Sequence, residues 1–160
     1  MQTIVTFEWS SNVANEVVGA TASTTNHRAD LPVSKVFGEQ VHHLYNYGMN
    51  ACDDPVLVNN CLVQCFLLVG TRPELLKQHQ SVVSNVFKAF RRILIQNKGA
   101  NLFTSRNEMS RVLTSLQQEA LFLKFERKLA YCEIAIIMDL PIEQLRRQIS
   151  KALDNLVRDK

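Results

Sequence analysis

Apolar residues recur every three or four positions along most of the chain after residue 32, which is the spacing of amphipathic helices. Residues 33–49, VSKVFGEQVHHLYNYGM, show this spacing first. The positions expected to face inward are Val33, Val36, Phe37, Val41, Leu44, Tyr45 and Met49. Asp53 or Asp54 can cap a second helix, and Pro55 suits its first turn. No strand-like alternation continues beyond residue 9, so the predicted fold is all-α.

The next two segments differ in how their apolar residues are distributed. Residues 56–69, VLVNNCLVQCFLLV, are apolar nearly all round and are predicted to form a buried central helix. After a turn at GTRPE, residues 75–96 are predicted to form one long helix. Its expected inward positions are Val83, Val86, Phe87, Phe90, Ile93 and Leu94.

Gly99 and the polar residues around it predict a linker over residues 98–110. A further helix is expected in residues 112–129. Its inward positions are expected to be Leu113, Leu116, Ala120, Leu121, Leu123 and Phe125. The chain is therefore divided into a tail at 1–32, a helical domain at 33–97, the linker, and a second helical domain at 111–160.

The last stretch predicts two helices joined by a tight corner at residues 139–141. On an ideal helix, one arc of about 100° collects apolar residues. These are Leu145, Ile149, Ala152, Leu153 and Leu156. The opposite side carries Gln144, Arg147, Lys151 and Arg158. This spacing fits a helix-turn-helix whose second helix enters the DNA major groove. It fits equally well an ordinary pair of packed helices with a solvated basic face.

The overall charge permits a nucleic-acid partner without requiring one, because the formal net charge is only +3. No apolar run approaches the eighteen or so residues of a membrane span, so no membrane insertion is expected. The N-terminus has no basic segment and carries Glu8 and Trp9 early, which is unlike a secretory signal. The cysteines show no CxxC pair, which predicts reduced thiols and a cytoplasmic protein. They are Cys52, Cys61, Cys65 and Cys132.

Cys61 and Cys65 lie four residues apart, with His42, His43 and Cys52 not far before them, so a zinc site is conceivable. The spacings match no standard zinc motif, and buried free cysteines explain them more simply. We therefore expect no metal and no cofactor. The chain also has no Gly-rich phosphate loop, no GxSxG and no paired carboxylates, so no enzymatic activity is predicted.

Two stretches together resemble a known family. Residues 113–156 are similar to region 4 of sigma-70-class RNA polymerase sigma factors, with Glu133-Ile134-Ala135 and the later Ala152-Leu153 at the matching places. Residues 36–75 resemble region 2 of the extracytoplasmic-function (ECF) sigma factors, in particular the Bacteroidetes branch. The segment VFKAFRRILI, residues 86–95, occupies the place that engages the −10 promoter element. The resemblance covers residues 33–158.

Family membership implies an alternative sigma factor that directs core RNA polymerase to promoters for transcription initiation. Region 2 would dock on the β′ clamp and capture unpaired −10 bases, while region 4 would sit on the β flap and read the −35 element. The family is commonly held inactive by an anti-sigma factor, which is the further partner implied.

The resemblance also implies site residues. The −10 element would be engaged by Lys88, Arg91 and Arg92, beside Phe87 and Phe90, which are themselves expected in the core. The −35 element would be read by Gln144, Arg147 and Lys151. Polymerase would be bound by Asn59, Asn60, Val63 and Gln64.

Two other functions stay open. The first is a DNA-binding regulator that dimerises through its N-terminal helices. The second is a sigma-like bundle that binds polymerase or an anti-sigma factor without reading promoters.

Overall fold

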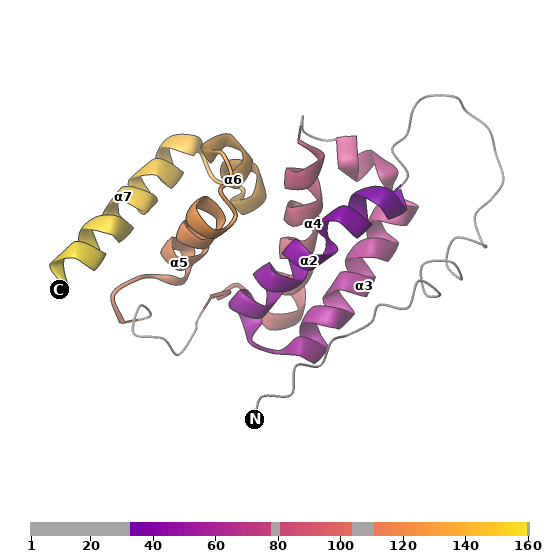
Figure 1. Ribbon diagram of the computed structural model, residues 1–160, viewed down its shortest axis with the longest axis horizontal. Helices are drawn as coiled ribbons and strands as arrows, with labels where there is room; N and C mark the ends of the chain where they lie inside the picture. Colours follow the sequence, from indigo (N-terminus) through magenta and orange to yellow (C-terminus); the bar gives the residue numbers. More distant parts are fainter. Residues whose placement is uncertain (1–32, 78–80, 104–110, 160) are drawn as a thin grey trace.

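The computed structural model describes residues 33–77, 81–103 and 111–159, and every regular element in these ranges is helical (Figure 1). The α-helices are α2 (Val33–Cys52), α3 (Pro55–Thr71), α4 (Val82–Lys98), α5 (Ser115–Leu121), α6 (Tyr131–Met138) and α7 (Ile142–Arg158). A 3-10 turn, η1 (Pro73–Lys77), and a π-helical turn, η3 (Phe122–Glu126), complete them. The predicted all-α class is confirmed. The tail at 1–32 and linker residues 104–110 lie outside the described residues.

Capping side chains fix where the helices begin. Asp54 accepts hydrogen bonds from the backbone N–H groups of Val56 and Leu57, both at 3.0 Å, so of the two cap candidates, Asp53 and Asp54, it is Asp54 that caps α3. Ser81 caps α4 by accepting from the N–H of Ser84 at 3.2 Å. The single helix predicted over 75–96 is therefore wrong. A serine hydroxyl that satisfies an unpaired N–H favours a helix start, and α4 begins directly after it.

The central helix is α4 rather than α3. It packs against α2, α3 and η1 on one side and against α6 on the other (Figure 1). Phe87 and Phe90 are fully buried in it, as predicted. Within the described residues, the helix α3 packs mainly against α2, α4 and η1, and one of its faces stays exposed. Its Val56 is 68% exposed, which corrects the prediction of a helix buried all round.

A glycine allows α2 to approach α3 closely. Gly48 is buried in α2, and a Cβ built there would lie 2.7 Å from Cγ1 of Val58 and 3.2 Å from the ring of Phe90. Real Cβ atoms do not come that near to a side-chain carbon. The absence of a side chain at Gly48 therefore sets the distance between these helices.

The C-terminal helix set consists of α5, η3, α6 and α7, and it lies on the far side of α4 from α3 (Figure 1). On α7 the predicted inward residues Leu145, Ile149 and Ala152 are buried, whereas Leu153 is exposed. Phe125, also expected inward, points to solvent. It lies in the π turn, where the wider helical register shifts side chains away from the direction that α-helical spacing predicts.

One hydrophobic core extends across the N-terminal helix set (α2, α3, η1 and α4) and the C-terminal set. Leu102 and Phe103, which the sequence placed in a linker, are buried within it. The N–H of Phe103 donates to the carbonyl of Ala51 at 3.0 Å and so ties this segment to the end of α2. Within the described residues, no helix combines the length and apolar character needed to cross a bilayer.

Candidate nucleic-acid interface

The helix α7 presents a polar face to solvent. Gln144, Arg147 and Lys151 are all exposed, on the side opposite the buried apolar residues. Among the described residues, neither Arg147 nor Lys151 forms an ion pair. The corner before α7 is made by Asp139, whose φ of 58° is left-handed and ends α6. These three predicted −35 residues therefore lie together on one accessible helix face.

The predicted −10 residues lie on the side of α4 that faces the C-terminal helix set. Lys88 is only 12% exposed and its Nζ lies 2.9 Å from Oδ1 of Asp139. Arg92 is 56% exposed, with Nη2 3.9 Å from Oδ2 of the same carboxylate. The hydrogen bond from Lys88 first, and its charge second, lower the pKa of Asp139. Asp139 therefore stays ionised and holds two of the three cations.

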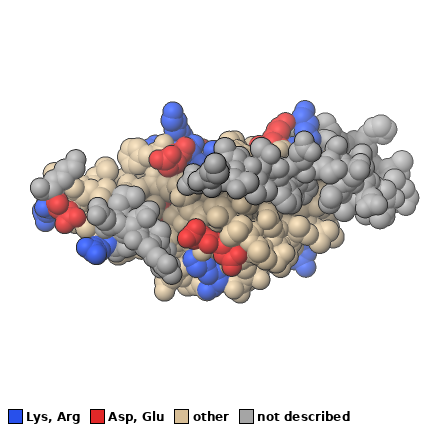
Figure 2. All heavy atoms as spheres, turned by 60° about the horizontal axis from the view of Figure 1, so that its bottom comes forward, with Lys and Arg blue, Asp and Glu red and all other residues tan. Residues whose placement is uncertain are grey.

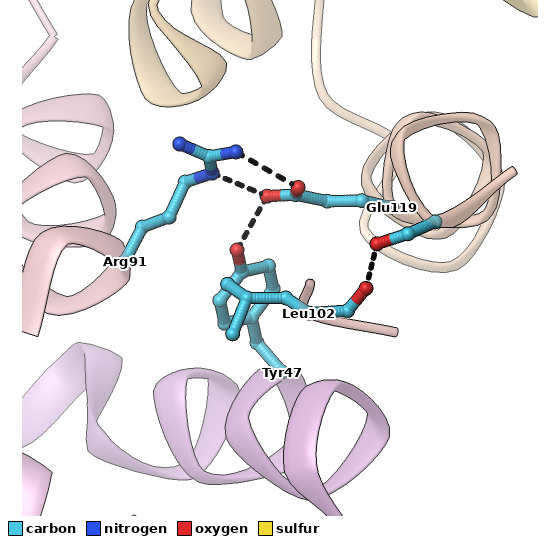
Figure 3. Close-up of polar contacts among 5 residues, drawn as sticks. Tyr47, Arg91, Leu102 and Glu119 are labelled. Atoms are coloured by element: carbon cyan, nitrogen blue, oxygen red, sulfur yellow. Dashed lines mark hydrogen bonds and ion pairs between the residues drawn. The ribbon is translucent and has the colours of Figure 1, made fainter. Parts of the chain in front are cut away.

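Arg91, the third predicted −10 residue, is held by a buried carboxylate (Figure 3). Its Nε donates to Oε1 of Glu119 at 2.6 Å and its Nη2 donates to Oε2 at 3.1 Å. Glu119 is 2% exposed and comes from α5. Tyr47 of α2 donates its hydroxyl to the same Oε1 at 2.5 Å. This buried triad, Tyr47–Glu119–Arg91, joins α2, α4 and α5.

The electrostatics of the triad follow from its burial. Burial first, and the charge of Glu119 second, raise the pKa of Tyr47 well above its usual value, so the phenol keeps the proton that it donates. Burial alone would lower the pKa of Arg91, but the hydrogen bonds and charge of Glu119 outweigh it and raise that pKa. Bidentate pairing of this kind is among the strongest contacts between side chains. Arg91 therefore stays charged and is paired with Glu119 through two hydrogen bonds.

Further contacts between the N-terminal and C-terminal helix sets lie near both ends of α4. Near the start of α4, the hydroxyl of Ser81 donates to Oε1 of Glu133 at 3.1 Å. The ring of Tyr47 lies 5.3 Å from Phe103 and 6.1 Å from Phe122, so an aromatic cluster backs the triad. Ser115, which begins α5, donates to the carbonyl of Leu102 (Figure 3).

A histidine makes the contact between the two helix sets sensitive to pH. Nη1 of Arg127 lies 2.7 Å from Nδ1 of His43 on α2. Partial burial first, then the charges of Arg127 and His42, lower the pKa of His43 below its model-peptide value of 6.5. The unfolded chain therefore binds this proton more readily than the folded chain does.

Acidification is accordingly expected to destabilise the fold through His43. Because the folded state disfavours protonated His43, the neutral ring makes its full contribution to stability above pH 6.5, the pKa in the unfolded chain. That contribution is lost as the pH falls from 6.5 toward the lower pKa of His43 in the folded protein. Melting temperatures measured between about pH 7.5 and about pH 5.5 should fall in wild type and fall less in His43→Gln. Equal slopes for the two proteins would contradict this role of His43.

The predicted polymerase-binding residues lie on the open face of α3. Asn60, Val63 and Gln64 are exposed, and Asn59 is half-buried. Exposed Val56 and Leu67 extend the same face. It is uncharged along its length, so contacts made through it would depend on apolar burial and amide hydrogen bonds.

Sequence reasoning missed two of the three triad residues, although the spacing held a signal. Glu119 lies three residues after Leu116 and four before Leu123, which places a carboxylate inside an apolar arc. A buried carboxylate requires a partner. Tyr47 likewise lies three residues after the fully buried Leu44. The pattern could have indicated a buried polar pair, but not which residues complete it.

Figure 2 shows the lysine and arginine side chains of one face in small separate groups, not in a single patch.

No three His, Cys, Asp or Glu side chains in the described ranges cluster as metal ligands would. Cys61 and Cys65 are buried in the core, where burial raises the pKa of Cys65 to about 12.

Comparison with known proteins gives one informative likeness. No protein-family model and no curated protein matches the sequence. Among solved structures, the chain is similar to a chain of the NMR structure of the PhyRSL–NepR complex from Sphingomonas sp. Fr1. The TM-score is 0.66 at 14% identity, over 80% of this chain and 88% of that chain. This likeness concerns the fold alone: the protein has an all-helical fold similar to that of a chain in this complex.

Proposed function

We propose that this protein is an alternative sigma factor of the ECF class, which brings core RNA polymerase to a set of promoters. The helix α4 engages the −10 element and α7 reads the −35 element. The protein supplies binding and strand capture, while the polymerase supplies the chemistry. The sigma-like fold and the accessible polar face of α7 support the proposal.

The face of α7 carries this proposal. Gln144, Arg147 and Lys151 follow at steps of three and four residues, which aligns them along one side of a helix. Arginine can bind the O6 and N7 atoms of guanine together, glutamine can bind adenine in the same way, and lysine can contact guanine or phosphate. All three side chains are exposed on a helix whose other side is anchored in the core. A helix anchored on one side in this way can present these groups, at helical spacing, to a major groove.

The proposal also assigns protein partners to the remaining faces. The open face of α3, with Asn60, Val63 and Gln64, would dock on the β′ clamp, and the C-terminal helix set would sit on the β flap. The solved complex to which this chain is similar pairs PhyRSL with NepR. An anti-sigma protein is accordingly the expected regulator here.

Transcription with purified core RNA polymerase tests the proposal. Core enzyme plus this protein should give discrete run-off transcripts from genomic fragments, and core enzyme alone should not. On a promoter found this way, Arg147→Ala should weaken duplex binding about ten-fold, as expected for loss of one good base contact. Fluorescence anisotropy with the promoter fragment measures the affinity.

The matched control is Lys35→Ala, which removes one exposed cation from α2. If affinity fell equally in both variants, the loss would reflect general charge rather than reading by α7. Core polymerase that binds the protein but starts no transcript would contradict the promoter-directing function.

A second candidate function is an interaction protein that binds an anti-sigma factor or polymerase without reading promoters. The observation that favours it is the engagement of Lys88 and Arg91 by carboxylates of the C-terminal helix set. Weak DNA binding without sequence preference would distinguish it.

A further inference from the structure

The side of α4 that carries its cations is covered from within the protein. Lys88, Arg91 and Arg92 all face carboxylates that come from beyond residue 110. Asp139 at the corner between α6 and α7 meets Lys88 and Arg92, and Glu119 of α5 meets Arg91. Within the described residues, each of these cations thus already has an anionic partner.

These carboxylates occupy the places that phosphate groups would need. A carboxylate and a phosphate present the same kind of anionic oxygen to lysine and arginine, and arginine can hold either through two parallel hydrogen bonds. Lys88 is only 12% exposed and Arg91 only 17% exposed while α5 and α6 cover them. A nucleic-acid strand therefore cannot reach them without moving the C-terminal helix set.

We propose that the arrangement described here is a closed, self-inhibited state, in which Asp139 and Glu119 compete with the backbone of single-stranded nucleic acid for the cations of α4. This inference rests on the proposed function and specifies how its −10 site is regulated. A strand first meets the exposed Arg92, then displaces Asp139 from Lys88. Complete opening also separates Glu119 from Arg91.

The two carboxylates contribute differently to closure. Asp139 is 68% exposed at its side chain, so its pairs are screened by salt and are easily exchanged for a phosphate. Glu119 is buried and shared with Tyr47, so it holds the closed state more strongly. Asp139 is therefore the contact to test, because asparagine in its place removes the charge and keeps an oxygen that can accept from Lys88.

The substitution Asp139→Asn isolates the charge. Asparagine adopts left-handed backbone readily, so it tolerates the φ of 58° that ends α6. Fluorescence anisotropy of the full chain with a labelled single strand of mixed sequence, about 20 nucleotides long, measures binding at low salt. The variant should bind about five-fold more tightly than wild type, the size expected for removing one exposed ion pair. Glu39→Gln removes the same charge from an exposed site on α2 and should change affinity less than about two-fold, which is the usual size of a surface effect.

A second readout follows opening without DNA. Energy transfer between a donor on native Cys132, which is exposed on α6, and an acceptor on Lys35→Cys of α2 reports the separation of the two helix sets. A Cys52→Ser background removes the half-buried thiol. Energy transfer in the wild-type protein should fall as added single strand saturates the protein. In Asp139→Asn it should be lower than in wild type before any strand is added.

Three outcomes are informative. Tighter binding with reduced energy transfer supports the inference. Unchanged affinity of Asp139→Asn together with unchanged energy transfer overturns it, and if the wild-type protein still directs transcription, the proposed function stands. Reduced transfer with unchanged affinity also overturns it, and shows that α4 is not the single-strand site, which counts against the −10 role in the proposed function.

Discussion

Replacement of Glu119 by alanine is expected to lower the free energy of unfolding by about 3–5 kcal/mol, the usual effect of breaking a buried ion pair by removing one partner. The loss is large because Glu119 is the hydrogen-bond acceptor of two other side chains, those of Arg91 and Tyr47. Arg91 would keep its charge in a covered site, and the hydroxyl of Tyr47 would lose its acceptor. Urea denaturation of the full chain, followed by far-ultraviolet circular dichroism, measures the change.

Glu126→Ala provides the matched control, because it removes an exposed carboxylate seven residues further along the chain. Its effect should stay within about 0.5 kcal/mol. Equal losses in the two variants would show that the triad contributes nothing specific. An apolar replacement of the whole triad, Tyr47→Phe with Arg91→Met and Glu119→Leu, should recover much of the stability, because no buried group is then left unpaired.

Substitution of Gly48 by alanine is expected to destabilise the protein by about 1–3 kcal/mol, the range for overpacking a tight core. The added Cβ would lie 2.7 Å from Cγ1 of Val58, and that side chain is itself fully buried. The helix propensity gained from alanine, at most about 1 kcal/mol, opposes the strain without removing it. Thermal and urea unfolding of the full chain would measure the net effect.

The same substitution at Gly38 should act in the opposite direction. A Cβ there meets nothing within 4 Å, so Gly38→Ala should stabilise α2 by about 0.5–1 kcal/mol. Combining Gly48→Ala with Val58→Ala should cost less than the two single changes added together, because the smaller residue makes room for the new methyl group. Additive effects would argue that α2 and α3 do not approach as closely as the structure describes.

Local features of the fold could be predicted from the sequence, because they depend on neighbours along the chain. Asp54 followed by Pro55 indicates a helix start, and the structure confirms the cap. The spacing of Leu145, Ile149 and Ala152 identified the inner face of α7. Ser81 also caps a helix, but the apolar spacing continues on both sides of it and so predicts one uninterrupted helix.

The closure of α4 could not be predicted, because it joins residues far apart in sequence. Tyr47 and Glu119 are 72 residues apart, and Lys88 and Asp139 are 51 apart. Periodicity assigns each of them to a helix face but does not say which faces meet. The roles of the −10, −35 and polymerase-binding residues rest on family resemblance and stay predictions until the binding and transcription experiments are made.

The anchoring of Phe103 beside Ala51 limits how far the closed state can open. With Phe103 held by α2 and Leu113 buried, covalent geometry allows these two residues to separate by at most roughly 35 Å. A tether this short keeps the carboxylates of the C-terminal helix set at an effective concentration on the order of millimolar near α4. A partner that holds the protein open must bind α4 strongly enough to compete with these tethered carboxylates. Lengthening the chain between Phe103 and Leu113 would dilute the carboxylates near α4, so a lower concentration of the partner would then suffice.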